Sequence, residues 1–391
     1  MSLRGIAELP LHYGKMPRWL YADMVKLAEA ISKIIVFEYS KKEMLKRLSD
    51  PFWFQAFGCV LGFDWHSSGL TTTVTAALRE AFLKANIGLF VAGGKGKTSK
   101  KTPEHIEKYA ERINMSEKKI GMLKFASKII AKTDNVALQD SYELYHHAFI
   151  FDENARYVVV QQGMNEFSSY ARRYHWLYDD INERGFFNDV HKIITSFKLP
   201  KVIDLASQKS QEARKECLDL AKEKTSLIKK ELQALKLPEK QKTLHEWIEI
   251  SQEELRNAII EKGKSQRIKK LIMQSEHEIF TLPKKLNWNA FKEAYEKNPK
   301  DFAELLSIRG MGKANIRALA LISALIYGKE PSWKDPSAYS FAHGGKDGVP
   351  YPINKLRYEK SIQLLHDAIK NAEIGKREKL NALRRLESFL G

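Results

Sequence analysis

Residues 301–326 read DFAELLSIRGMGKANIRALALISALI, and this stretch sets the architecture expected for the C-terminal part of the chain. Apolar residues at 302, 305, 306 and 308 form one face of a short helix. The chain then turns through Gly-Met-Gly, and apolar residues resume with helical spacing between 316 and 326. The pattern predicts two helices joined by a tight turn, with Met311 inserted into the core between them.

The residues of this turn suit a phosphate group. Gly310 and Gly312 allow backbone N–H groups to come close to a ligand. The second helix begins at the same point, and its N-terminal amides and dipole favour an anion. Arg309, Lys313 and Arg317 would add positive charge around it. The alternatives are an ordinary helical turn with a glycine cap, or a turn that contacts another protein.

The stretch resembles the helix-hairpin-helix family of sequence-independent DNA-binding elements, in its apolar positions and in Gly-x-Gly. It departs from the family at Ile316, where a small residue is usual, and at Arg309, where proline is common. The resemblance implies contact with the nucleic-acid backbone.

The composition is that of a folded, strongly basic protein. The chain has 391 residues, 43% hydrophobic and 29% charged, and a net charge of +17. Such a charge attracts polyphosphate, although a basic surface without a partner is the alternative. No run of 18 apolar residues occurs, so we expect no membrane helix. The two cysteines, Cys59 and Cys217, are far apart, so we expect reduced thiols in a cytoplasmic protein. The N-terminal residues lack the apolar stretch of a signal peptide.

Changes of composition divide the chain into three predicted regions. Residues 1–200 form an α+β domain with a small sheet or β-hairpin and the candidate active site. Residues 201–285 form a charged helical connector, and 286–391 form the domain that carries the helix-hairpin-helix element, so the middle and C-terminal regions are predominantly α-helical. The elements expected from periodicity and turn residues are helices at 18–36, 41–49, 70–86, 117–132 and along 355–390, a strand at 88–92, and a hairpin of 147–151 with 156–162.

Two polar clusters interrupt the first half of the N-terminal domain. Asp64 and His66 lie in GFDWHSSG, where they are candidate catalytic residues or part of a helix-capping turn. Lys95 and Lys97 lie in GGKGKTSKK, which lacks the first glycine of a nucleotide-binding P-loop. We therefore expect a flexible basic loop on a phosphate backbone rather than an ATP site.

A third cluster, QDSYELYHH at 139–147, contains the candidate catalytic residues Asp140, His146 and His147. Carboxylate and imidazole together suit Mg²⁺, Mn²⁺ or Zn²⁺ in phosphodiester hydrolysis, with Asp140 and His147 as the first candidate ligands. Asp140 closes a helical segment and the histidines open a strand, so these groups are expected to meet at the end of a sheet. The alternative is a helix end and strand start with solvated polar residues.

A fourth cluster, ARRYHW at 171–176, places Arg172 and Arg173 beside aromatic residues. The pair suits phosphate clamping or base stacking. It also suits a helix with one basic and one aromatic face.

These clusters together resemble the domain of unknown function family 763, found mainly in archaea and thermophilic bacteria. The resemblance rests on LPLHYGKMPRWL, RLSDPFWFQAFGCVLGFDWHSSGLTTTV, VAGGKGKTSKKTPE, ALQDSYELYHHAFIF, VVVQQGMN, ARRYHWL and DPSAYSFAHGGKDGVPYP. It implies one shared architecture over nearly the whole chain except the helical middle. It implies no activity, so the chemistry rests on the residues.

Three functions follow from these features, each with DNA as the expected partner and RNA not excluded. The first is a metal-dependent DNA-processing nuclease that uses Mg²⁺ or Mn²⁺. The second is a DNA-binding or architectural protein without catalysis or cofactor. The third is a base-excision glycosylase, in which Asp335 stands at about the right distance after the second helix of the hairpin.

Overall fold

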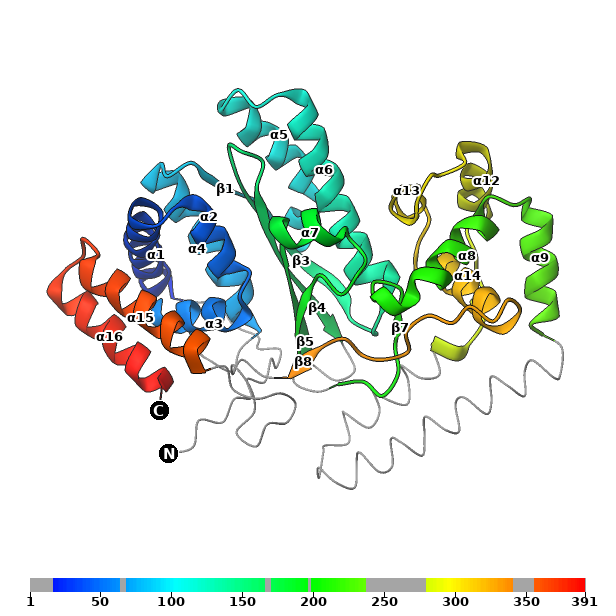
Figure 1. Cartoon of the computed structure of the whole chain (residues 1–391). Helices are drawn as coiled ribbons and strands as arrows, with labels where there is room; N and C mark the ends of the chain where they lie inside the picture. Colours follow the sequence, from blue (N-terminus) through cyan, green and yellow to red (C-terminus); the bar gives the residue numbers. More distant parts are fainter. Residues whose placement is uncertain are drawn as a thin grey trace, which may run out of the picture.

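A computed structural model of the chain describes residues 17–63, 68–165, 170–195, 198–236, 279–339 and 355–390. A twisted sheet stands at the centre, with helices on both of its faces and a further helical unit beside it (Figure 1). The predicted combination of a small sheet with many helices is confirmed.

The central sheet has six strands in the order β1-β3-β4-β5-β6-β8. All neighbours are antiparallel except β6 and β8, which are parallel. The strands are β1 Leu89–Lys95, β3 Glu143–Asp152, β4 Tyr157–Asn165, β5 Tyr170–Leu177, β6 Lys192–Thr195 and β8 Ala338–Tyr339. A separate pair joins β2 Leu138–Gln139 to β7 Ile203–Asp204.

The predicted hairpin of β3 and β4 is confirmed, and Asp152 holds its turn. The Asp152 carboxylate accepts the backbone N–H groups of Asn154 and Arg156 and pairs with the Arg156 guanidinium. Ala155 takes the left-handed conformation, with φ of 61°. These contacts fix the register, so that Phe151 lies opposite Tyr157 and His147 lies opposite Gln161.

Helices at the start of the chain cover one face of the sheet. They are α1 Arg18–Glu38, α2 Lys41–Leu48, α3 Pro51–Val60 and α4 Gly69–Ala85. Ser40 and Asp50 cap α2 and α3, and Pro51 occupies the first turn of α3, where its missing N–H costs nothing. The helices predicted at 18–36, 41–49 and 70–86 are confirmed to within a few residues.

The opposite face of the sheet carries α5 Thr102–Arg112 and α6 Glu117–Lys132. Their apolar residues, including Ile106 and Leu123, form a core with Phe149, Val159 and Trp176 of the sheet. Helix α7 Tyr178–Arg184 follows β5. The short helix η1 Gly96–Lys101 precedes α5, and the short helix η2 Thr133–Ala137 follows α6. The helix predicted at 117–132 is confirmed.

A second core lies in the helical unit that follows the sheet. Its elements are η3 Gln208–Ser210, α8 Gln211–Ala221, α9 Thr225–Ala234, α12 Trp288–Lys297, α13 Phe302–Ser307 and α14 Lys313–Leu325. Leu220 and Ile228 pack there with Leu305, Met311 and Leu319. Part of the predicted connector therefore shares a core with the predicted C-terminal domain.

The final helical stretch consists of two helices, α15 Lys355–Asn371 and α16 Lys376–Leu390, which are orange-red and red in Figure 1. Leu365, Ile369 and Leu386 pack into the core of α1–α4 and not into that of α12–α14. The stretch predicted as one unit from 286 to 391 is thus shared between two cores. An amphipathic helix buries its apolar face wherever a matching surface exists, and periodicity does not specify which one.

In the described ranges, no helix combines the length and the apolar character needed to span a membrane.

Candidate nucleic-acid interface

The predicted hairpin is formed by α13, a turn at 308–312, and α14. Asp301 caps α13 by accepting the Glu304 N–H, and Glu304 in turn accepts the Lys300 N–H. Ile308 and Met311 are buried in the second core, so the turn is anchored by its own apolar residues. The predicted placement of Met311 is confirmed.

The two glycines of the turn have different roles. Gly310 has φ of 83°, and a Cβ there would lie 2.2 Å from Nδ2 of Asn287. The fold itself therefore requires glycine at this position. Gly312 has an ordinary φ of −111°, and a Cβ there would meet only the Gly310 carbonyl oxygen, at 3.9 Å. The missing side chain of Gly312 leaves open space at the start of α14.

The start of α14 is open to a ligand. Gly312 is the N-cap and provides no side-chain hydrogen bond to the first amides of this 13-residue helix. Arg309 and Gly310 are exposed, and Lys313 is partly exposed and paired with Glu143. Arg317, predicted beside the phosphate, is only 9% exposed. The positive groups at the turn are thus Arg309 and Lys313, together with the helix dipole.

Helix α6 connects this turn with the basic segment after β1. Lys124, Lys128 and Lys132 follow one another at intervals of four residues and therefore share one helix face. Lys132 Nζ donates to the Met311 carbonyl oxygen at 2.7 Å, which joins the end of α6 to the turn. Burial, with a smaller contribution from Lys128, lowers the pKa of Lys132.

The segment GKTSKK at 96–101, predicted as a flexible loop, forms the short helix η1. Ser99 donates to the Gly96 carbonyl and Thr102 donates to the Ser99 carbonyl, and these bonds close the turn. Lys95 and Lys97 are exposed, and the Lys95 ammonium lies 6.0 Å from the centre of the Tyr145 ring. The expected exposure of these lysines agrees with the structure, whereas the expected lack of secondary structure does not.

His146 and His147 lie on opposite faces of β3, because side chains alternate along a strand. His146 Nε2 lies 3.1 Å from Thr75 Oγ1 of α4, and burial lowers the pKa of this histidine to about 3. His147 faces α6, with Nε2 2.9 Å from Ser127 Oγ and Nδ1 2.6 Å from Gln161 Oε1. The two histidines therefore belong to separate polar networks.

Asp140 is buried, and its hydrogen-bond partners do not include either histidine. Its carboxylate accepts from the Arg172 guanidinium at 2.9 Å and from the Tyr174 hydroxyl at 2.8 Å. Arg172 also pairs with Asp335 at 2.8 Å, so one guanidinium serves two carboxylates. Burial raises the pKa of Asp140, whereas Arg172 and backbone amides hold the pKa of Asp335 below its ordinary value despite its burial. This arrangement ties the segment after α14 to the sheet.

Arg172 and Arg173 are fully buried, so they do not form the predicted clamp on an external phosphate. ARRYHW is a strand and not a helix, and it is covered on both faces. Arg173 donates to Gln55 at 2.9 Å and to Thr71 at 3.3 Å on the side of α3 and α4. Alternation along β5 therefore sends the two guanidinium groups into two different buried networks.

The predicted metal ligands do not fit a cation as they are placed. The Asp140 oxygens accept from Arg172, Tyr174 and the Tyr142 N–H, and both ring nitrogens of His147 have partners. No group of three or more His, Cys, Asp or Glu suited to a metal occurs within the described ranges. Asp64 and His66 lie outside those ranges, so a metal site that includes them stays a prediction.

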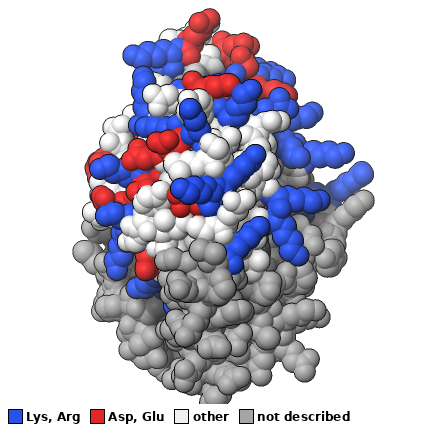
Figure 2. Space-filling model, turned by 90° about the vertical axis from the view of Figure 1, so that its right-hand side faces the viewer, with Lys and Arg blue, Asp and Glu red and all other residues white. Residues whose placement is uncertain are grey.

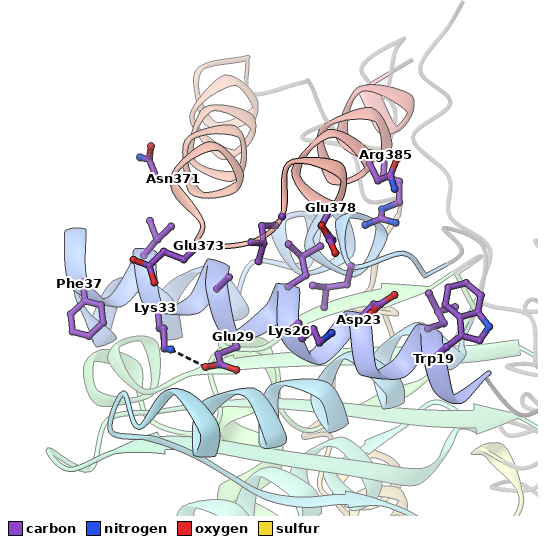
Figure 3. A pocket seen from close by; sticks show the side chains of 18 of the residues that line it. Trp19, Asp23, Lys26, Glu29, Lys33, Phe37, Asn371, Glu373, Glu378 and Arg385 are labelled. Atoms are coloured by element: carbon purple, nitrogen blue, oxygen red, sulfur yellow. Dashed lines mark hydrogen bonds and ion pairs between the residues drawn. The ribbon is translucent and has the colours of Figure 1, made fainter.

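A cavity of about 660 Å³ lies between α1 and the α15–α16 pair, away from the hairpin (Figure 3). Trp19 and Phe37 stand at its two ends. Five carboxylates and three cations line it: Asp23, Glu29, Glu38, Glu373 and Glu378, against Lys26, Lys33 and Arg385. This charge balance does not suit a polyanion.

Figure 2 looks onto the side of the molecule formed by α9 and α12. On the described part of this side, Lys and Arg occur on both margins and project most along the right-hand one, while Asp and Glu lie mainly at the top and toward the left. The positive charge is therefore distributed unevenly over this side. The lysines of α6 were not predicted as a site, although their four-residue spacing is visible in the sequence.

The fold and this surface define an α+β protein with an attached helical unit and a row of lysines leading to a glycine turn. The chain belongs to the family described as protein of unknown function (DUF763), whose model matches residues 5–353. The predicted resemblance is thus confirmed. No curated protein and no solved structure matches the chain.

Proposed function

We propose that this protein binds the backbone of nucleic acid, with DNA as the first candidate, along a surface that we call the lysine track. The track consists of η1, the lysine face of α6, and the turn at 309–313. The observation that carries the proposal is the hydrogen bond from Lys132 to the Met311 carbonyl, since it joins the α6 lysines to the open start of α14.

The spacing of the lysine track suits a phosphate backbone. Lysines four residues apart on a helix stand about 6 Å apart along its axis. Phosphates of one DNA strand follow one another at about 3.4 Å along the duplex axis. Lys124 and Lys128 can therefore contact alternate phosphates, while the backbone N–H groups after Gly312 donate to another. Such contacts carry no sequence information, so we expect binding without sequence preference.

The test measures fluorescence anisotropy of a labelled 20-base-pair duplex between about 50 and 200 mM salt. Gly312→Ala adds a methyl group where the fold has room and is expected to weaken binding about tenfold or more. Lys128→Gln should lower the slope of log K against log salt by about 0.9. Lys118→Gln, the same change on the same helix outside the track, is the control.

Unchanged affinity in both Gly312→Ala and Lys128→Gln would refute binding along this surface. Matched single-stranded and duplex DNA and RNA of the same length then show which nucleic acid is preferred. A duplex preference with equal affinity for unrelated sequences is the expected result.

Strand cleavage is a second candidate function, favoured by the chain of hydrogen bonds through His147. Ser127 Oγ lies 2.9 Å from His147 Nε2, His147 Nδ1 lies 2.6 Å from Gln161 Oε1, and Gln161 Nε2 donates to Asp134 at 2.6 Å. An activated nucleophile needs a hydroxyl, a base and a group that orients the base, each within hydrogen-bond distance of the next.

Cleavage is tested by incubating labelled DNA and RNA with the protein, with Mg²⁺ or Mn²⁺ and separately with EDTA. Loss of products in both Ser127→Ala and His147→Gln, with folding and binding retained, supports the pair as catalytic residues. Products that form only with the metal and persist in these variants would direct attention to Asp64 and His66 instead.

A further inference from the structure

A pocket of about 490 Å³ lies beside the lysine track, between η1, α6 and the sheet. Its size is that of a small-molecule site and exceeds what a lone phosphate fills. The described residues that line it are Ser99, Lys100, Thr102, Pro103, Lys124, Phe125, Ser127, Lys128, Ala131, Leu144, His146, His147 and Gln161.

The charge of this pocket favours an anion. Lys100, Lys124 and Lys128 line it, and no Asp or Glu is among its described lining residues. Lys124 is held by Glu107 of α5 at 3.2 Å, while Lys100 stands on η1 and Lys128 is exposed one turn further along α6. Positively charged side chains of two elements, η1 and α6, thus line the pocket.

The inner wall is neutral and has defined hydrogen-bonding directions. Gln161 Nε2 donates to Asp134 and to the Ile130 carbonyl, so its Oε1 faces His147 Nδ1. That nitrogen therefore carries the proton, and His147 Nε2 accepts from the Ser127 hydroxyl. Burial lowers the pKa of His147, which keeps the ring uncharged. The lone pairs of Ser127 remain available to a ligand donor.

Apolar surface completes the lining. Phe125 is 39% exposed, and Leu144, Pro103 and Ala131 also line the pocket. A ligand that satisfies the whole lining has an anionic group for the lysines and a flat part with polar edges for the inner wall. Among constituents of nucleic acid, a nucleotide with its phosphate has this combination.

We infer that this pocket binds a single nucleotide unit, with its phosphate at Lys100 and Lys128 and its base or sugar toward Ser127 and Phe125. The unit is either a free nucleoside monophosphate or the terminal nucleotide of a strand on the lysine track; the second source rests on the proposed function.

The experiment is isothermal titration of the full chain with the four deoxynucleoside monophosphates, with deoxyadenosine and inorganic phosphate as partial ligands. At least one monophosphate is expected to bind at least tenfold more tightly than either partial ligand. Ala131→Leu fills the pocket without changing its charge and should reduce that affinity more than tenfold. The double change Lys100→Gln with Lys128→Gln should also weaken it, and Lys118→Gln with Lys119→Gln is the matched control.

Thermal unfolding of each variant establishes that it is folded. Failure of all four monophosphates to bind, or an Ala131→Leu variant that binds as the parent does, overturns the inference. A 5′-phosphorylated oligonucleotide that binds more tightly than its 5′-hydroxyl counterpart, with the difference lost in Ala131→Leu, assigns the strand end as the source. If duplex DNA binds but no monophosphate does, the proposed function stands and the pocket is not a nucleotide site. If a monophosphate binds but duplex DNA does not, the pocket is a nucleotide site and the lysine track does not bind nucleic acid.

Discussion

Replacement of Asp335 by asparagine should cost the fold about 3–5 kcal/mol, the range for breaking a buried ion pair. The Asp335 carboxylate accepts from Arg172 at 2.8 and 3.3 Å, from the Leu199 N–H at 2.8 Å and from the Ser337 N–H at 2.9 Å. Asparagine turns one of these acceptor oxygens into a donor and leaves Arg172 with a single carboxylate, that of Asp140.

Asp140→Asn provides the contrast on the same guanidinium. Burial raises the pKa of Asp140, whereas the pKa of Asp335 is lowered. The charged form is therefore less favoured at Asp140 than at Asp335. Loss of charge at Asp140 should therefore cost less, about 1–3 kcal/mol. The expected order of stability is the parent, then Asp140→Asn, then Asp335→Asn.

Urea unfolding followed by circular dichroism measures both free energies. A loss of 3–5 kcal/mol corresponds to a fall in Tm of roughly 6–20 °C for a cooperative unit of about 150–250 residues. Nucleic-acid binding is then measured well below Tm, where Asp335→Asn should bind as the parent does. A fully stable Asp335→Asn variant would show that this ion pair contributes nothing to stability. If the parent releases bases from DNA and the stable variant does not, Asp335 would be supported as a catalytic carboxylate.

The remaining predictions concern pH and the turn. The pKa of His146 in the folded protein, about 3, lies below its unfolded value of 6.5, so the unfolded chain takes up the proton first. His146 therefore lowers stability as pH falls from 6.5 toward 3, by up to about 1.4 kcal/mol per pH unit, and His146→Gln should reduce this slope in urea titrations at several pH values. Gly310→Ala should cost about 1–3 kcal/mol because of its positive φ and the contact with Asn287, whereas Gly312→Ala should cost under about 1 kcal/mol. Equal losses in the two glycine variants would contradict the distinction drawn between them. Lys132→Met removes a donor to the Met311 carbonyl and should cost about 1 kcal/mol, seen as a small shift of the urea midpoint with unchanged slope.

Local patterns in the sequence predicted much of the secondary structure. The helix boundaries near 18, 41, 70 and 117 were correct because apolar periodicity acts within a few positions, and at 41 Ser40 also caps the helix. The β3–β4 hairpin was correct for the same reason, since the turn at 152–155 supplies its own hydrogen bonds. The turn between α13 and α14 was correct because its two glycines and the apolar residues around them lie within a few positions, although Lys132 and Asn287 also contact it.

The candidate site was predicted only in part. Lys95, Lys97 and Arg309 are exposed and Lys313 is partly exposed, as expected for basic residues in a turn. Ser127 and Gln161 were missed as partners of His147, because they come from another helix and another strand. The contact with Ser127 depends on how α6 packs on the sheet, and no local pattern encodes that packing.

The sequence by itself determined the elements, the basic charge, the glycine turn and membership of the family, because each of these depends on residues close together in the chain or on a long continuous match. The tertiary structure alone decided which polar residues are available to a ligand. Arg172 and Arg173 look like phosphate ligands in the sequence, yet β5 lies inside the sheet with helices on both faces, so both guanidinium groups are buried and satisfied from within. Lys124 and Lys128 look like an ordinary solvated helix face, yet packing places them beside a pocket and in line with the α14 turn. Burial is a property of the whole packed chain, and it separates charged groups that hold the fold together from those that remain free to bind.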